Sequence, residues 1–347
     1  MICWTAPYNT LVMTGEEIEQ LIAGTFPAPC NNPELIETHI SWVILCDDTV
    51  FKIKKPLKYS FLDFSTLELR QHYCEREVAL NNRLTQDVYL DVLPVRKTPS
   101  GFSLGGDQGE IVDFAVFMRK LDNARRMDVL LRNGRVTEEH MRSLARQLVT
   151  FHQEAAIVYP KDPLDIRSKF NDIKGQGVFI RQELGDHYGN ILDDTLRKSD
   201  EFVLGNKRLF EDRIEDGFHR DGHGDLHSRN IFLLDEPVVF DCIEFNDDYR
   251  QVDVLNEVAF LCMDLDAFDR GDLAWLFMED YTSQFSVISG KRDLALFNYY
   301  KCYRANVRAK VNSLRARDAA DSASASHALR ESARYLDLMH IYTKNFS

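Results

Sequence analysis

Residues 223–230 of the chain read HGDLHSRN, and Asp241 follows eleven positions after Asn230, at the end of an apolar run. Asp225 carries a carboxylate that can accept a proton, and Asn230 and Asp241 carry oxygen atoms of the kind that Mg²⁺ prefers. Phosphoryl transfer needs a base and oxygen ligands for the metal, and kinase catalytic loops space their aspartate and asparagine in this way. The stretch therefore predicts a kinase-type site, with Asp225 as the catalytic base and Asn230 and Asp241 as metal ligands.

The chain between the two predicted ligands has the pattern of a β-hairpin. Residues 231–234 and 238–240 are apolar and rich in β-branched or aromatic side chains, and residues 235–237, DEP, are a turn signal. Asn230 enters the hairpin and Asp241 leaves it, so we expect the two side chains to lie close enough to hold one site together.

Two other interpretations of the same stretch remain open. Asp225 could be an ordinary loop aspartate that bonds its own backbone. His223 and His227 could bind zinc together with Asp225, but no Cys or His cluster lies near enough in the sequence to complete the set of ligands. The ordered combination of His, Asp, Asn, hairpin and second Asp favours the kinase-type site.

Length and composition predict a soluble globular protein with room for two lobes. The chain has 347 residues, of which 44% are hydrophobic and 28% charged, and its formal net charge is −13. This charge argues against a non-specific nucleic-acid binder, which needs a basic surface. No uncharged apolar run approaches membrane-spanning length, and no basic region followed by an apolar run opens the sequence, so we expect neither a membrane segment nor a signal peptide.

The cysteines point to a reducing compartment. They are scattered, odd in number and mostly placed inside apolar patterns, which predicts free thiols, no disulfide framework and a cytoplasmic location. They are Cys3, Cys30, Cys46, Cys74, Cys242, Cys262 and Cys302.

Residues 34–56 predict two strands that carry a phosphate-binding lysine. Asp47-Asp48 makes a turn between them, and Lys52 and Lys54 share one face of the second strand. A kinase places a lysine here against the nucleotide phosphates, and the spacing favours Lys52 without excluding Lys54. The alternative is a solvated strand end.

A helix over residues 65–84 is predicted to supply the partner of that lysine. Ser65 is a candidate N-cap with Glu68 three residues later, as in a capping box. We favour Glu77 over Glu75 as the ion-pair partner, because an apolar stripe follows Glu77. An exposed surface glutamate is the alternative.

The predicted nucleotide-binding lobe lacks a glycine-rich loop. Residues 38–41, THIS, lie in its place, and the hydroxyl and amide of Ser41 are candidates to cover phosphates. No Gly-x-x-x-x-Gly-Lys-[Ser/Thr] motif occurs anywhere in the 347 residues, which argues against a P-loop kinase site in this sequence.

Residues 88–121 predict three strands, of which the last runs over 111–118. Residues 117–121 would then link two lobes, with the backbone of Met118 beside an adenine ring. We expect an α+β fold in which residues 1–120 form a small, mainly antiparallel β lobe with one helix. Residues 121–347 would form a larger, mostly helical lobe.

Three further residues are candidates for substrate binding. Glu244 follows Asp241 by three positions and could contact metal or substrate. Arg304 and Arg308 lie four apart on one helical face and could bind an anionic acceptor, although such pairs more often face solvent or bond a carboxylate. Asp253 is a good cap for a buried helix, and in a kinase-like lobe such an aspartate also braces the catalytic loop.

The whole pattern resembles the aminoglycoside phosphotransferase-like branch of the protein-kinase-like fold. It is most similar to a bacterial subgroup often fused to a P-loop ATPase domain. The resemblance rests on the catalytic loop with Asp241 and on the helix that opens at Asp253. It also rests on residues 38–42, THISW, 52–56, KIKKP, 61–65, FLDFS, and 303–308, YRANVR.

This resemblance implies ATP and Mg²⁺ as cofactors and transfer of the γ-phosphoryl group to a hydroxyl of a small-molecule acceptor. Lys52 and Glu77 would hold the phosphates, with Asp225, Asn230 and Asp241 in the roles given above. A catalytically weak nucleotide-binding regulator is the alternative suggested by the missing glycine-rich loop. A protein kinase is less favoured, because no Ala-Pro-Glu follows Asp241. The identity of the acceptor and the oligomeric state stay open.

Overall fold

A computed structural model describes residues 13–346, so Cys3 and the predicted absence of a leader lie outside the described residues. The chain divides into two compact units. The first comprises Met1–Arg125 and Val238–Asp247, and the second comprises Arg126–Pro237 and Asp248–Ser347. The chain therefore leaves the first unit after Arg125 and returns to it for the short segment that contains Asp241.

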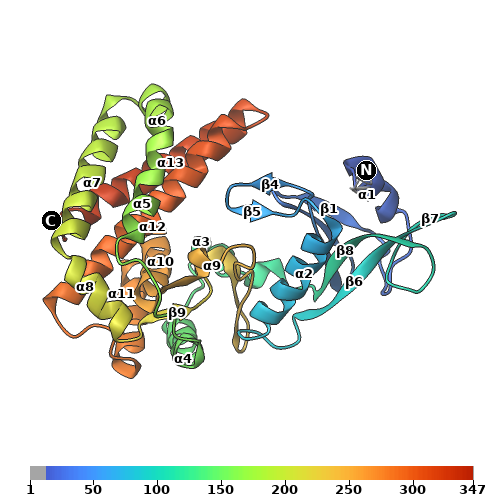
Figure 1. Ribbon diagram of the computed structural model, residues 1–347, viewed down its shortest axis with the longest axis horizontal. Helices are drawn as coiled ribbons and strands as arrows, with labels where there is room; N and C mark the ends of the chain where they lie inside the picture. Colours follow the sequence, from blue (N-terminus) through green and yellow to red (C-terminus); the bar gives the residue numbers. More distant parts are fainter. Residues whose placement is uncertain (1–12, 347) are drawn as a thin grey trace, which may run out of the picture. The chain divides into compact units, whose positions relative to one another are not determined.

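A six-stranded antiparallel sheet forms the centre of the first unit, with strand order β1-β2-β3-β8-β6-β7 (Figure 1). The three predicted strands of residues 88–121 are confirmed as β6, β7 and β8. The register places Lys52 of β3 opposite Val43 and Val116 of its two neighbours. The strands are β1 (Glu34–Glu37), β2 (Ser41–Leu45), β3 (Thr49–Lys54), β6 (Tyr89–Thr98), β7 (Gly101–Leu104) and β8 (Glu110–Arg119), and the small pair β4 (Lys58–Tyr59) and β5 (Leu62–Asp63) stands apart.

The predicted linker begins too early. Phe117, Met118 and Arg119 are still paired within β8, where Met118 lies opposite Tyr89 and Val50. The strand is longer than its apolar run because its hydrogen bonds to β3 continue to Arg119, which pairs with Thr49.

Helix α1 (Gly15–Ile22) covers one side of the sheet core. Thr14 caps it and forms a capping box with Glu17. Ile18 and Leu21 are fully buried in the cluster that contains Phe51 of β3. Their spacing is that of the apolar face of an amphipathic helix.

Helix α2 (Leu67–Asn81) has a different cap from the predicted one. Thr66 is the N-cap and accepts from the amide of Leu69. The Ser65 hydroxyl and amide both donate to Asp63 Oδ1, at 2.5 and 3.1 Å, so that side chain is engaged elsewhere. The buried face of α2 is formed by polar and small residues instead of an apolar stripe: Arg70, Cys74, Glu77 and Asn81.

The second unit is mostly helical, as predicted. Helix α12 packs against α10 and α13, and α11 packs against α4 and α10 (Figure 1). Its helices are α3 (Met127–Arg132), α4 (Glu138–Glu154), α5 (Asp165–Asn171), α6 (Gly177–Leu184), α7 (Asp186–Gly205), α8 (Lys207–Glu215), α9 (Asp247–Arg250), α10 (Val254–Ala267), α11 (Gly271–Gln284), α12 (Lys291–Arg317) and α13 (Ser322–Tyr342). The 3-10 turns are η1 (Asn123–Arg125), η2 (Asp172–Gln176) and η3 (Ser228–Asn230).

Short strands frame the catalytic stretch in this unit. Strand β9 (His219–Asp221) pairs antiparallel with β12 (Gln251–Asp253) just before the HGDLHSRN segment. The hairpin predicted after Asn230 is confirmed as β10 (Ile231–Leu233) and β11 (Pro237–Val239). The catalytic stretch therefore lies between two small sheets.

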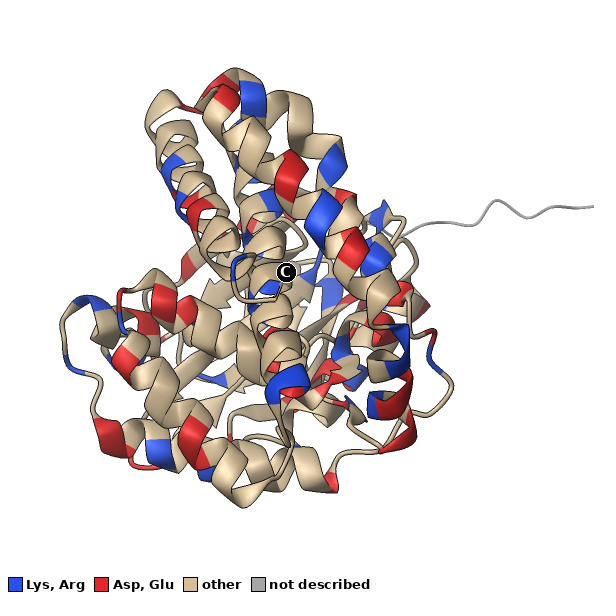
Figure 2. Cartoon of the chain, turned by 90° about the vertical axis from the view of Figure 1, so that its left-hand side faces the viewer, with Lys and Arg blue, Asp and Glu red and all other residues tan. Residues whose placement is uncertain are grey.

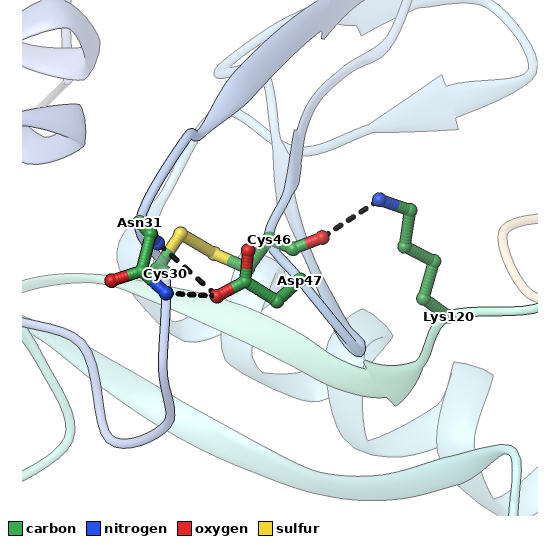
Figure 3. The surroundings of a disulfide bond; sticks show 5 residues. All are labelled: Cys30, Asn31, Cys46, Asp47 and Lys120. Carbon is green, nitrogen blue, oxygen red and sulfur yellow. Dashed lines mark hydrogen bonds between the residues drawn. A yellow bond between two sulfur atoms is a disulfide. The ribbon is translucent and has the colours of Figure 1, made fainter.

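A disulfide joins Cys30 to Cys46, which corrects the prediction that the chain has none (Figure 3). Asn31 donates its backbone and side-chain N–H groups to Asp47 Oδ2 beside it, at 3.3 and 2.7 Å. Lys120 donates to the carbonyl of Cys46 at 2.8 Å. The spacing of the cysteines did not predict this disulfide. Cys30 lies in an irregular segment after α1, and Cys46 comes close to it only when the sheet has formed. The other described cysteines are buried thiols outside this disulfide.

Charged residues of both signs are interspersed along the helices that face the viewer in Figure 2. On α7, for example, Arg197 pairs with both Asp194 and Glu201. Among the described helices, none combines the length and the apolar composition that crossing a membrane requires.

Candidate active site

The catalytic loop is held by a buried carboxylate from α10. Glu257 Oε1 accepts hydrogen bonds from the amides of His223, at 2.8 Å, and Gly224. Its Oε2 bonds His152 Nε2 at 2.8 Å, and His152 in turn bonds the Tyr281 hydroxyl at 2.7 Å. Glu257 thereby ties the backbone before Asp225 to α4 and α11.

The prediction that Asp253 braces the catalytic loop is therefore wrong, because Glu257 accepts the hydrogen bonds from the loop amides. Asp253 caps α10 through the amide of Leu255, as predicted, at 2.8 Å. Its carboxylate is otherwise engaged by Arg213, with two bonds of 2.7 Å, and by the Tyr300 hydroxyl at 3.2 Å. Because Arg213 and Tyr300 occupy it, the loop amides bond Glu257, one turn further along α10.

Asp225 is partly exposed, with 38% of its side chain accessible, and lies next to two histidines. Its Oδ2 is 3.3 Å from His227 Nε2, and its amide donates to His223 Nδ1 at 3.2 Å. Burial raises the pKa of Asp225, but the charges of His227, Arg308 and His223 outweigh it and hold that pKa well below its ordinary value. The carboxylate is therefore ionised throughout the physiological pH range.

Asn230 is oriented by Asp225. Its Nδ2 donates to the backbone carbonyl and to Oδ2 of Asp225, both at 3.1 Å. Within the described residues its Oδ1 accepts no hydrogen bond, which leaves one hard oxygen of the kind that Mg²⁺ takes. The loop thus fixes Asp225 and Asn230 against each other.

The histidines of the loop use their ring nitrogens for the backbone. His223 Nδ1 accepts from the amide of Asp225, and His227 Nδ1 accepts from that of Arg229. Residues 13–346 contain no group of three or more His, Cys, Asp or Glu side chains arranged to hold a metal ion. The zinc interpretation thus gains no support.

In the first unit, a chain of ion pairs runs through both candidate lysines. Lys52 Nζ lies 2.7 Å from Asp241 Oδ1 and 2.8 Å from Glu77 Oε1. Lys54 Nζ lies 2.6 Å from Glu77 Oε2 and also pairs with Glu244. Glu77 therefore binds one lysine with each of its oxygens, whereas Glu75 is exposed and bonds Gln71.

The surroundings of the two lysines differ. Lys54 is fully buried, and its Nζ lies 4.9 Å from the centroid of the Phe64 ring. Its ammonium group forms ion pairs with Glu77 and Glu244. Lys52 keeps 16% of its side chain accessible. Burial lowers the pKa of Lys52, but Asp241 and Glu77 overcome this and raise it well above its ordinary value. The geometry therefore favours Lys52 as the lysine that can reach a ligand.

Glu77 stays ionised although it is fully buried. Burial raises the pKa of its carboxyl, but the charges of Lys52 and Lys54 and their hydrogen bonds lower it to about 2. The two lysines compensate the charge of this buried carboxylate. Glu77 therefore holds both lysine side chains in position.

Asp241 is held in an unusual backbone conformation. Its φ of 61° lies in the left-handed region, which non-glycine residues rarely adopt and which is often found at functional sites. The Tyr89 hydroxyl accepts from its amide at 3.0 Å, and Asn81 Oδ1 accepts from the amide of Cys242 at 2.9 Å. The carboxylate is 43% accessible, and its Oδ2 accepts no hydrogen bond within the described residues.

The remaining candidates have structural partners. Glu244 is buried and forms an ion pair with Lys54, so its carboxylate is not available to bind a substrate. Ser41 is fully buried; its amide donates to Thr38 Oγ1 at 2.9 Å, whereas its hydroxyl has no hydrogen-bond partner. Arg304 donates to Asn256 Oδ1 at 2.6 Å and to the Gly224 carbonyl at 3.0 Å, so it supports the catalytic loop.

Four residues of the site escaped the sequence-based prediction: Glu257, His152, Tyr89 and Asn81. Each acts through polar contacts with backbone groups or with side chains far away in the sequence. Such contacts leave no periodic pattern, and the only available signal was a charged or polar residue inside an otherwise apolar helix or strand.

Comparison with known proteins places the chain among kinase-like folds. No protein-family model matches the sequence. Uncharacterized proteins of Mycobacterium bovis and Mycobacterium tuberculosis are 36% identical over 293 residues, which are 80% of the chain. The chain covers 54% of their length, so it spans about half of the curated relatives it matches.

Two solved structures share the fold. A choline/ethanolamine kinase family protein from Mesorhizobium loti matches 91% of this chain and 94% of its own, with a TM-score of 0.50 and 13% identity. A spectinomycin phosphotransferase in complex with ADP and spectinomycin matches 96% of this chain and 99% of its own, with a TM-score of 0.53 and 10% identity. They confirm the predicted protein-kinase-like α+β fold and, at the level of the fold, the resemblance to aminoglycoside phosphotransferases.

Proposed function

We propose that the chain is a phosphotransferase that moves the γ-phosphoryl group of ATP to a hydroxyl of a small-molecule acceptor. The observation that carries this proposal is Lys52, whose ammonium group lies 2.8 Å from Glu77 and 2.7 Å from Asp241. Kinases hold the phosphates of their nucleotide with such a pair of strand lysine and helix glutamate beside a metal-binding aspartate. The fold supports the proposal, because it is shared with a spectinomycin phosphotransferase crystallised with ADP.

Each of the two candidate metal ligands offers an oxygen of the kind that Mg²⁺ takes. Asn230 Oδ1 and Asp241 Oδ2 accept no hydrogen bond within the described residues and are hard ligands. Bound Mg²⁺ would offset the negative charge of the nucleotide phosphates. Lys52 binds those phosphates in this proposal, and Glu77 holds the lysine in place.

Asp225 is proposed to receive the acceptor hydroxyl. Its low pKa keeps it ionised, so it always offers an oxygen to that hydroxyl. A carboxylate with such a low pKa is a weak base, and general-base efficiency is highest when the pKa lies near the working pH. We therefore assign most of its contribution to orienting the hydroxyl and the rest to proton acceptance, in line with the largely positional catalysis of phosphoryl transfer.

A nucleotide-binding regulator is the second candidate, and one observation favours it. The turn between β1 and β2 is closed on itself: Thr38 N donates to the Ser41 carbonyl, and Ser41 N donates to Thr38 Oγ1, each at 2.9 Å. Lys55 also donates to the Thr38 carbonyl at 2.6 Å. A turn whose amides are used in this way has fewer donors for phosphates than a glycine-rich loop.

Binding of Mg-ATP, measured by calorimetry, tests the role of Lys52. Lys52→Met should weaken binding at least about tenfold, because it removes a charge-assisted contact to phosphate. Lys58→Met is the matched control, since the Lys58 side chain is 70% accessible and lies on β4. Equal affinity in wild type and Lys52→Met would remove Lys52 from the nucleotide site.

Lys54→Met separates a structural lysine from a ligand-binding one. It leaves Glu77 and Glu244 facing each other without their shared cation, which should lower the free energy of unfolding by about 3–5 kcal/mol. If Lys54→Met instead folds normally and loses Mg-ATP binding, then Lys54 binds the nucleotide and Lys52 has the structural role.

A further inference from the structure

A stripe of arginines on α12 begins at the catalytic loop. Arg304, Arg308 and Arg315 are four and eleven positions apart, close to whole turns of a helix with 3.6 residues per turn, so they share one face. Arg304 touches the carbonyl of Gly224, the residue before Asp225, at 3.0 Å. The stripe therefore starts beside the proposed base and continues along the helix.

Most buried arginines of the chain are paired with aspartate. Arg70 pairs with Asp113, Arg213 with Asp253 and Arg250 with Asp221. These pairs satisfy the rule that a buried charge needs an opposite charge or a full set of hydrogen bonds.

Arg308 and Arg315 depart from that rule. Within the described residues, neither makes an ion pair with a carboxylate. Arg308 is only 7% exposed, its Nε has no hydrogen-bond partner, and its guanidinium lies 5.6 Å from the ring of Tyr335. Arg315 is half-buried on the same face.

A third arginine joins them from the catalytic loop. Arg229 lies in η3, four residues after Asp225, and is also half-buried without an ion pair in the described chain. Burial lowers the pKa of Arg315, and the charges of Arg308 and Arg229 lower it further. Burial also lowers the pKa of Arg308, but Tyr335, Asp264 and Asp225 raise it above its ordinary value. Asp264 Oδ2 accepts from the amide of Ser228 at 2.9 Å.

We propose that Arg229, Arg308 and Arg315, the arginine cluster, bind an oxyanion group of the acceptor. Guanidinium groups match carboxylates and phosphates in geometry, and an anion would relieve the repulsion within the cluster. Resting on the proposed function, this makes the acceptor an anionic alcohol, either a hydroxycarboxylate or a phosphorylated polyol. Its hydroxyl would lie at Asp225, and an amino alcohol would be repelled from the same place.

Binding of inorganic phosphate, measured by calorimetry, tests the cluster without requiring catalysis. Arg315→Gln should raise the dissociation constant at least about tenfold, since it removes a charge-assisted contact. Arg317→Gln is the matched control on the same helix, because Arg317 is 50% accessible and pairs with Asp318. Arg315→Gln should weaken phosphate binding by the same factor in a Lys52→Met background, which separates the cluster from the nucleotide site. Equal phosphate affinity in wild type and Arg315→Gln would overturn the proposal.

A matched acceptor panel then tests the substrate class. Glycerol, glycerate, glycerol 3-phosphate and ethanolamine are each incubated with the chain and Mg-ATP, and products are identified by mass spectrometry. The proposal expects an anionic member to be phosphorylated best, with a KM raised in Arg315→Gln and unchanged in Arg317→Gln. Preference for glycerol or ethanolamine would contradict it. Phosphate binding that Arg315→Gln abolishes, without transfer to any member, would support the cluster and count against the transferase activity.

Discussion

Glu257 connects the catalytic loop to two helices through one buried carboxylate. It receives two loop amides on one oxygen and His152 on the other. A β-carbon at Gly222 would lie 2.4 Å from Glu257 Oε2, so the chain needs a glycine where it passes this carboxylate. The position of Asp225 therefore depends on Glu257, a residue that touches no substrate in the proposed mechanism.

The ionisation of Glu257 should contribute to the pH dependence of the free energy of unfolding. Burial raises the pKa of Glu257, but the hydrogen bond and charge of His152, with further help from His223 and Gly224, lower it to about 2. Because the folded pKa lies below the ordinary value of about 4.3, the stabilisation is complete above that value and is lost as the pH falls towards 2. Glu77, also with a pKa of about 2, contributes in the same window.

We predict that Glu257→Gln makes unfolding less dependent on pH. The loss of free energy of unfolding between pH 6 and pH 3, measured by urea denaturation, should be smaller than in wild type, and stability at pH 6 should fall by about 3 kcal/mol. Glu139→Gln is the control, since that side chain is 70% accessible. A pH profile identical to that of wild type would show that Glu257 does not stay ionised in the folded chain.

At the scale of elements, α2 shows where sequence patterns fall short. The stripe expected to be buried was apolar, but the helix turns Arg70, Cys74, Glu77 and Asn81 inwards. Each polar member has a distant partner, such as Asp113 for Arg70 and the amide of Cys242 for Asn81. The expected ion pair between Glu77 and the strand lysine is present, but the burial of Glu77 follows from the two lysines and not from the neighbouring apolar residues.

The disulfide is the element-scale feature with the clearest effect on stability. Cys30 and Cys46 are 16 residues apart in the sequence, and a closed loop of that size is worth about 3 kcal/mol through the entropy of the unfolded chain. We predict that a reductant lowers the thermal midpoint of the wild type to that of Cys30→Ser. The same reductant should leave Cys30→Ser unchanged, which controls for effects on the other cysteines. If the reductant leaves the thermal midpoint of the wild type unchanged, the disulfide between Cys30 and Cys46 does not form.

At the scale of the molecule, the main strands of the first unit and the helical second unit were predictable from sequence. Alternating strands, turn signals and the hairpin after Asn230 are local patterns, and the structure contains them. The return of residues 238–247 to the first unit was not predictable, because it depends on contacts such as Lys52 with Asp241, 189 positions apart. Long-range ion pairs between polar residues carry no periodicity, so only the folded chain reveals them.

Each unit contributes its own residues to the proposed function. Asp225 and Asn230 belong to the second unit, and Lys52, Glu77 and Asp241 belong to the first. Binding of Mg-ATP, with transfer to a hydroxyl beside Asp225, is the central claim of the proposed function.

Transfer of a labelled γ-phosphoryl group from Mg-ATP to a hydroxyl-bearing small molecule tests this claim most directly. Wild type and the control Asp235→Asn, altered at an exposed hairpin turn, should label the same acceptor at similar rates. Asp225→Asn should bind Mg-ATP normally and transfer roughly 10²–10⁴-fold more slowly, the usual worth of a positioned general base. Mg-ATP binding without label on any acceptor, or an Asp225→Asn variant as fast as wild type, would contradict the account.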